Sequence, residues 1–160
     1  MPKSEREVTA VWKGGLAFEA VSPSGFTVRM DSGAGGAAFS PTELVLVGLA
    51  GCTGMDVAEI LRKKRQEVTG MEVRVTGSRA PEHPRRFTAL HVAYTVTGRQ
   101  VDAEAVRRSI ELSQTKYCSV AATLREAAPI TTEFEIHEAV PSADGQGVQP
   151  AFITRGDSDE

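Results

Sequence analysis

The sequence predicts a single α+β domain in which strands and helices come in groups. Apolar and polar residues alternate in short segments, at residues 8–30, 71–76, 89–96 and 132–136. One long helical pattern of apolar residues covers residues 41–61, and two shorter helical patterns follow residue 102. Because helices and strands do not alternate one by one, this order favours an α+β domain over a wound parallel sheet.

We expect one folded domain over residues 1–139 and a mobile tail over residues 140–160. A chain of 160 residues is long enough to bury a core in one domain. The last 21 residues are poor in apolar side chains and rich in Gly, Pro and acidic residues, which is typical of a mobile segment.

Three short strands are expected between Val8 and Met30. Gly14 and Gly15 suit the first turn and residues 22–25 the second, since Gly, Pro and Ser are turn-forming residues. The glycine-containing segment at residues 31–38 is interpreted as a connector or as a lid beside a site.

The long helix has a clear predicted start. Ser40 suits the N-cap, Pro41 the first helical position and Glu43 the third, which together form a capping box. The basic run at residues 62–65 suits the negative end of the helix dipole, so we interpret it as helix termination and not as a nucleic-acid patch.

Glycines recur at every third position of this helix, at Gly48, Gly51 and Gly54. Each glycine costs about 1 kcal/mol relative to alanine inside a helix. We therefore expect another element to approach this backbone closely, either another helix or the same helix from a second copy. A helix apolar over most of its circumference is expected to be central and buried.

The second half of the chain predicts two strands, two helices and a last strand. Asp102 is expected to cap a helix that carries Val106, Ile110 and Ser113 on one face. A third helix is expected at residues 119–127.

Composition excludes several classes of function. The net charge is −3, which gives no electrostatic reason for binding nucleic acid or an anionic membrane. The N-terminal residues contain no apolar core of a secretory signal. No stretch is judged long and apolar enough to span a bilayer, because residues 44–50 are interrupted by glycine and soon followed by charge. We expect a cytoplasmic protein.

Cys52 and Cys118 are the only two cysteines. In a reducing compartment, two cysteines are more often free, catalytic or redox-cycling than a permanent disulfide. Cys52 lies in the middle of the apolar helix, where a packed core residue and a functional thiol are both plausible. Asp56 follows one turn later on the same face, and its negative charge disfavours a nearby thiolate.

Cys118 directly precedes a helix expected to begin at Ser119, and Lys116 is close in sequence. A helix N-terminus and a neighbouring cation both stabilise a thiolate. Local electrostatics therefore ranks Cys118 above Cys52 as the reactive thiol. The alternative interpretation is a residue packed beneath the sheet.

No metal site and no cofactor site are expected. The histidines at His83, His91 and His137 are scattered, and no CxxC or HxxxH spacing occurs. Two thiols far apart in sequence are too few ligands for structural zinc. Glu43 is a possible catalytic acid, but the capping box already accounts for it.

Three segments resemble the OsmC/Ohr family, and two more favour its OsmC-like subgroup over the organic hydroperoxide resistance enzymes themselves. The first three are Ser40–Leu44, Gly51–Val57 and Lys116–Val120, and the other two are Arg62–Gln66 and Glu82–Pro84. The resemblance covers residues 6–138.

This resemblance implies an intertwined homodimer in which two antiparallel sheets wrap around paired central helices. It also implies thiol peroxidase chemistry, in which Cys52 attacks a hydroperoxide, Cys118 resolves the product as a disulfide, and a dithiol re-reduces the pair. The substrates would be organic or inorganic hydroperoxides, and the role would be defence against oxidative or osmotic stress.

The sequence departs from the family's peroxidases at two activating positions. Those enzymes carry Arg soon after a Gly-Gly pair, where this chain has Leu16, and Glu directly after the helix-opening Pro, where it has Thr42. Glu43 is one position later and therefore points about 100° around the helix. Arg29, or an arginine of a partner chain, is the candidate substitute.

The leading hypothesis is therefore a two-cysteine peroxidase. The first alternative is a dimeric protein without catalytic activity that binds a small apolar or thiol-reactive ligand beside the cysteines. The second is a structural or interaction module in which both cysteines are packing residues.

Overall fold

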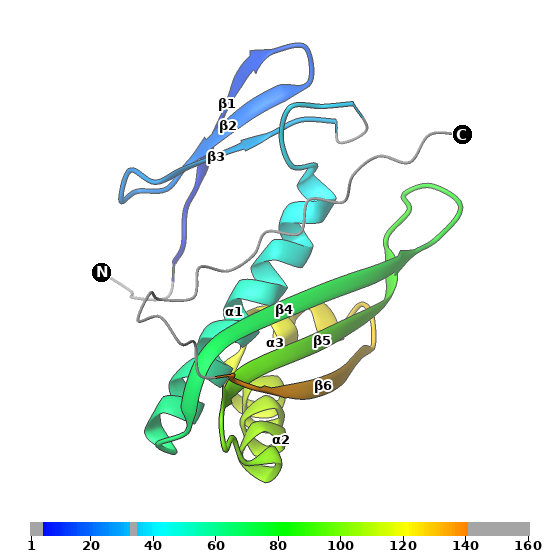
Figure 1. Ribbon diagram of the computed structural model, residues 1–160. Coiled ribbons are helices and arrows are strands. Elements are labelled where there is room, and N and C mark those ends of the chain that lie inside the picture. Colours follow the sequence, from blue (N-terminus) through cyan, green and yellow to red (C-terminus); the bar gives the residue numbers. More distant parts are fainter. Residues whose placement is uncertain (1–4, 33–34, 141–160) are drawn as a thin grey trace, which may run out of the picture.

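The structure of the protein is a computed structural model that describes residues 5–32 and 35–140. The expected mobile tail at residues 140–160 lies outside these residues except for Val140. The chain forms the elements β1 Thr9–Gly14, β2 Ala17–Val21, β3 Thr27–Met30, α1 Pro41–Lys63, β4 Glu67–Arg79, β5 Phe87–Arg99, α2 Ala103–Leu112, the π-helix η1 Ser113–Tyr117, α3 Ser119–Arg125 and β6 Ile130–Glu138 (Figure 1). The α+β class is confirmed.

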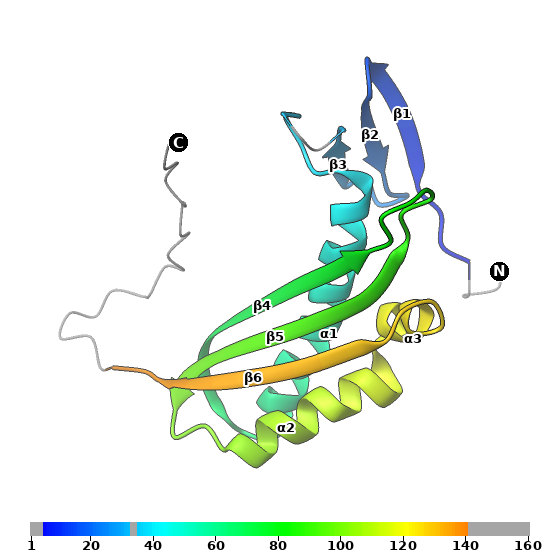
Figure 2. The same ribbon diagram turned by 90° about the vertical axis from the view of Figure 1, so that its right-hand side faces the viewer.

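Strands β1, β2 and β3 form an antiparallel sheet of three strands. Figures 1 and 2 show this sheet beyond the N-terminal end of α1, projecting away from the rest of the chain. Within the described residues it makes no extensive contact with a helix or with the second sheet. Large apolar side chains of this region are open to solvent: Trp12 of β1 is 63% exposed, and Leu16 in the connection from β1 to β2 is 70% exposed.

Strands β4, β5 and β6 form the second sheet, with β5 in the centre. The pair β4–β5 is antiparallel, whereas β5 and β6 run parallel, with Leu90 opposite Ile130. The expectation of two antiparallel sheets is therefore wrong for this last pair. The reason is that α2, η1 and α3 form a crossover between β5 and β6, which returns the chain to the end of the sheet where β5 began.

Helix α1 begins as the sequence predicts. The Ser40 hydroxyl accepts the Glu43 backbone N–H at 3.2 Å, and the Glu43 carboxylate accepts the Ser40 backbone N–H at 2.7 Å. Both bonds satisfy amide groups that have no partner inside the helix, so the capping box is confirmed. Asp102 likewise caps α2 through the Glu104 backbone N–H.

One stripe of α1 enters the core. Its buried residues recur every fourth position, at Leu49, Thr53, Val57 and Leu61. This stripe packs against β4 and against the helices α2 and α3, while alternate residues of β5 fill the other side of the core. The sheet and the three helices therefore share a single core.

The three glycines of α1 lie in two different environments. A Cβ atom at Gly54 would lie 3.2 Å from the Val73 side chain, so the element that approaches this glycine is strand β4, not the helix that we expected. At Gly48 and Gly51 nothing among the described residues lies within 4 Å of such an atom. Beside them Val47 is 46% exposed, so residues 5–32 and 35–140 leave this face of α1 uncovered.

By length and composition α1 could cross a bilayer, so the expectation that no stretch qualifies is wrong on that criterion. A core helix of a soluble protein meets the same criterion, and α1 packs one stripe into the core described above. The exposed remainder of the helix is the face that carries Gly48 and Gly51.

Candidate functional site

The fold brings the two cysteines together. Cys52 lies in the middle of α1, and Cys118 lies at the N-cap of α3. Their two sulfur atoms and a carboxylate oxygen of Asp56 all lie within 4.8 Å of one another. Both cysteines are free, and Cys118 is buried whereas Cys52 is half-buried. The thiols, far apart in sequence, therefore form one cluster with Asp56.

The cluster forms because α1 presents two of its members on one face. Cys52 and Asp56 are four residues apart, which places them one above the other on a helix. Helix α3 packs against α1 and supplies Cys118 from its first turn. The predicted positions of Cys52, Asp56 and Cys118 are thus consistent with a shared site.

The backbone before Cys118 is a π-helix, η1. The Cys118 backbone N–H donates to the Ser113 carbonyl at 2.9 Å, and the Cys118 sulfur accepts the Ala121 N–H at 3.3 Å. Single π turns inside helical segments are rare and often occur at functional sites. Here the turn ends the α2–η1 segment and starts α3 at the cysteine itself.

Burial raises the pKa of the Cys118 thiol to about 11. The Cys52 thiol raises this pKa further, as does the negative charge of Asp56, while the Ala121 N–H lowers it. The helix N-terminus does favour the Cys118 thiolate, but burial outweighs it, so the expectation of a stabilised thiolate at Cys118 is wrong. The Cys118 side chain is only 2% exposed, and its removal from water disfavours the charged thiolate. This effect is larger than the stabilisation of the thiolate by one backbone N–H of a seven-residue helix.

A buried hydrogen-bond network lies next to the thiols. The Thr53 hydroxyl lies 2.6 Å from the Tyr94 hydroxyl and 2.8 Å from the Ser113 hydroxyl. The Ser113 hydroxyl donates to Asp56 Oδ2 at 2.9 Å. The Gln114 amide donates to both Thr53 and Tyr94 at 3.2 Å. The network therefore joins α1, β5 and η1 and ends on the carboxylate of the thiol cluster.

Sequence reasoning missed Thr53, Tyr94 and Gln114 and saw Ser113 only as part of a helix face. The sequence does indicate buried hydrogen bonds for Tyr94 and Ser113. A tyrosine on the apolar face of a strand and a serine on the apolar face of a helix both need buried polar partners. Burial also raises the pKa of Tyr94, so its hydroxyl stays protonated.

Glu43 and Arg29 do not reach the cluster in one chain. Hydrogen bonds from Ser40 hold Glu43 at the exposed start of α1 and lower its pKa. Arg29 is 79% exposed in the first sheet and pairs with Glu19 at 3.7 Å. Within the described part of the chain, neither forms an ion pair or a hydrogen bond with Cys52, Asp56 or Cys118.

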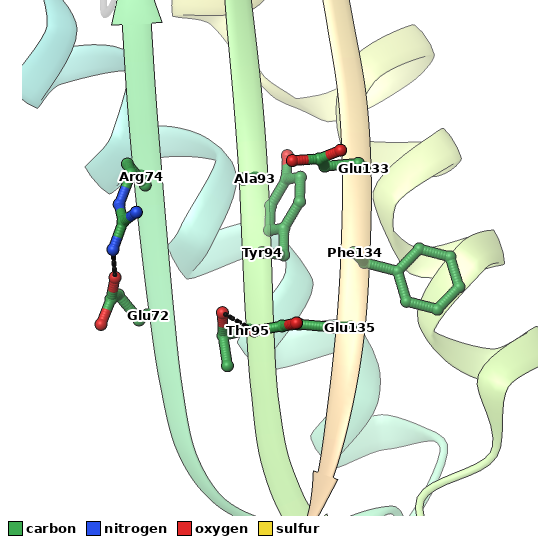
Figure 3. A pocket seen from close by; sticks show the side chains of 8 residues that line it. All are labelled: Glu72, Arg74, Ala93, Tyr94, Thr95, Glu133, Phe134 and Glu135. Carbon is green, nitrogen blue, oxygen red and sulfur yellow. Dashed lines mark hydrogen bonds and ion pairs between the residues drawn. The ribbon is translucent and has the colours of Figure 1, made fainter.

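The solvent face of the second sheet carries a polar hollow of about 380 Å³. Figure 3 shows Glu72 paired with Arg74 and Thr95 paired with Glu135 on this face. Neither cysteine lines the hollow. It is therefore separate from the thiol chemistry. The histidine His91 lies on the same polar face, next to Glu133, as its place in the alternating strand predicts.

Comparisons with known proteins find similar sequences over most of the chain. The sequence pattern of the family described as OsmC-like protein matches residues 33–133. Protein YhfA of Escherichia coli K12 is 44% identical over 125 residues, which cover 78% of this chain and 93% of YhfA.

Among solved structures, a hypothetical protein from Aquifex aeolicus has a TM-score of 0.77 at 27% identity, covering 86% of this chain and 99% of that one. The organic hydroperoxide resistance protein OhrB of Bacillus subtilis has a TM-score of 0.57 at 20% identity, covering 82% and 98%. The second likeness concerns the fold alone. The matched residues and the identity to YhfA show that this chain belongs to the OsmC-like protein family.

Proposed function

We propose that the protein reduces organic or inorganic hydroperoxides through Cys52 and Cys118. The observation that carries this proposal is the distance between the two sulfur atoms, which is no more than 4.8 Å on the fold of a family that includes peroxide-resistance proteins. Two thiols so close together can be oxidised to a disulfide without moving either helix far.

The reaction takes two steps. The Cys52 thiolate attacks the terminal oxygen of ROOH, the O–O bond breaks, and the products are a Cys52 sulfenic acid and an alkoxide that takes up a proton to leave as ROH. The Cys118 sulfur then attacks the Cys52 sulfur, the S–O bond breaks, and the hydroxyl leaves as water with the Cys118 proton. A dithiol supplies two electrons and two protons to restore both thiols.

The surroundings of the two thiols support this division of roles. Cys52 is half-buried and so reachable by a substrate, while Cys118 is buried and its pKa is raised to about 11. A thiol with a high pKa is a poor first nucleophile at neutral pH. Cys118 is better suited to the intramolecular step, because its sulfur lies within 4.8 Å of the Cys52 sulfur.

We further infer that the working protein is a homodimer in the cytoplasm. The first sheet exposes Trp12 and, in its first turn, Leu16, and no described residue of the same chain covers the face of α1 at Gly48 and Gly51. A second copy would cover both surfaces, and an arginine of that copy is the candidate partner for the thiols. Such an arginine would replace the activating residue that Leu16 does not supply.

The test is a thiol count on the reduced protein before and after one equivalent of cumene hydroperoxide, followed by a peptide map. We expect rapid loss of two thiols per chain and a Cys52–Cys118 disulfide. Cys52→Ser should abolish turnover with a dithiol, whereas Cys118→Ser should stop at an oxidised Cys52. Thiols that stay unreacted for minutes, or turnover that persists in Cys52→Ser, would exclude the mechanism.

A second candidate function is ligand binding without catalysis. It is favoured by Leu16 and Thr42 at the family's activating positions and by the negative charge of Asp56 beside both sulfurs. A small apolar or thiol-reactive ligand beside the cysteines should then raise the melting temperature. If this shift persists after both cysteines are replaced by serine, binding does not need the thiols.

A further inference from the structure

We propose that Cys52, Asp56 and Cys118 form a binding site for a soft divalent metal ion, with Zn²⁺ as the probe. The three side chains offer two sulfurs and one carboxylate oxygen within 4.8 Å of one another. They come from two packed helices, so the ligands are held by elements of the core.

The spacing of these atoms suits a tetrahedral ion. Zinc lies about 2.3 Å from sulfur and about 2.0–2.2 Å from a carboxylate oxygen, so ligand atoms on one zinc ion are about 3.5–3.8 Å apart. The sulfurs of Cys52 and Cys118 would therefore have to approach each other by about 1 Å or less. Rotation of the Cys52 side chain, which is only half-buried, can supply such a movement.

The carboxylate is already oriented by a second residue. Ser113 donates its hydroxyl hydrogen to Asp56 Oδ2 at 2.9 Å and is itself 2.8 Å from the Thr53 hydroxyl. Metal-binding carboxylates are commonly held by such outer hydrogen bonds, which keep the oxygen in place. Ser113 and Thr53 are both fully buried, which restricts their motion.

The donor set determines which metal fits. Thiolates select zinc, cadmium and copper(I), whereas magnesium and calcium prefer sites made only of oxygen. Binding of Zn²⁺ replaces the protons of both thiols, which leave as two H⁺, and the ion offsets the negative charge of two thiolates and one carboxylate. Three protein ligands leave a fourth position for water, the arrangement of zinc sites that remain open.

Metal binding and peroxide reduction would exclude each other, a consequence that rests on the proposed function. While both sulfurs are bonded to the ion, neither can attack ROOH or form the disulfide. Zinc would therefore preserve the reduced pair, and oxidation would release the ion.

The experiment titrates the reduced, metal-free full chain with Zn²⁺ against a chromophoric chelator and counts bound metal after gel filtration. We expect one Zn²⁺ per reduced chain and none in the disulfide form. Cys52→Ser should lose stoichiometric binding. Ser113→Ala should weaken the affinity about 10–100-fold, as expected for a residue that orients a ligand, and Asp56→Asn at least as much.

Glu59→Gln is the matched control, since Glu59 is an acid on the same helix that pairs with Arg62 outside the cluster. It should bind Zn²⁺ like the unmodified chain. Circular dichroism of each variant checks that the fold is retained. Absence of Zn²⁺ binding, or binding that is unchanged in Cys52→Ser or in Asp56→Asn, would overturn the site.

The same samples separate this proposal from the reductase. Peroxide turnover is measured in the presence of a chelator, without metal. A chain that turns over peroxide but binds no Zn²⁺ overturns the metal site alone. A chain that binds one Zn²⁺ through the three residues but leaves peroxide unreacted supports the metal site and overturns the reductase alone.

Discussion

The two sheets of this protein differ in how they are supported. The second sheet packs on α1, α2 and α3 and contains the core, with Leu49, Val57 and Val92 fully buried. The first sheet has the same number of strands, yet Trp12 and Leu16 remain largely exposed. Both sheets follow the alternating pattern of strands, so the pattern alone does not reveal which one has a covering layer.

The difference between the two sheets coincides with the position of the candidate site. Both thiols and the hydrogen-bond network lie in the supported region, where helices hold them within a few ångströms. The first sheet contributes none of these side chains within one chain. The second sheet and its helices therefore supply the reactive groups. The first sheet and the face of α1 at Gly48 and Gly51 are surfaces on which a second copy could pack.

The largest expected effect concerns the buried thiol of the supported region. Because the pKa of Cys118 is raised to about 11, its thiolate fraction should rise about tenfold per pH unit from pH 8 to pH 10 and then begin to level off. The rate of Cys118 alkylation by iodoacetamide, measured by peptide mapping of the native reduced protein, should follow the same slope. The urea-unfolded chain serves as the control. Alkylation of native Cys118 at pH 8 as fast as in the unfolded chain would contradict the buried placement.

The next largest effect compares one substitution in both regions. Leu49→Ala removes a fully buried side chain and should lower the free energy of unfolding by about 2–5 kcal/mol. Leu16→Ala changes a side chain that is 70% exposed and should alter the stability of a single chain by no more than about 0.5 kcal/mol. Urea unfolding at low protein concentration measures both. A large loss for Leu16→Ala only at high concentration would show that a second copy covers the first sheet.

Much of the fold was predictable because its signals are local. The capping box of Ser40 and Glu43, the cap at Asp102 and the alternation along β5 each depend on neighbouring residues, and all are confirmed. The parallel pairing of β6 was not predictable in this way. It depends on how far the α2–η1–α3 crossover carries the chain, which no local pattern records.

The candidate site was predictable in its residues but not in its electrostatics. Cys52, Asp56 and Cys118 stand out in sequence, yet the helix N-terminus at Cys118 suggested a stabilised thiolate. Burial has the larger effect, and burial depends on the packing of α1 against α3. The link from Asp56 through Ser113 to Thr53 joins α1 to η1, which are far apart in sequence, and therefore has no signature in any one segment.

The smallest effect, and the most informative about the uncovered face, is expected at the glycines of α1. Gly48→Ala places a methyl group where nothing among the described residues of the same chain lies within 4 Å. In a single chain this change should stabilise the helix by about 1 kcal/mol, because alanine restricts the unfolded backbone and favours the helix.

The sign of that effect depends on what faces α1. If the glycine face of a second copy packs closely against Gly48, the added methyl groups must collide, so the variant should weaken the dimer. Sedimentation equilibrium and urea unfolding at two protein concentrations separate the stabilisation of the single chain from the weakening of the dimer. Gly54→Ala is the matched control, because its neighbour is Val73 of the same chain, and any loss there should not depend on concentration. A stability gain for Gly48→Ala at every concentration would mean that no backbone lies against this face, and the homodimer would then have to form elsewhere.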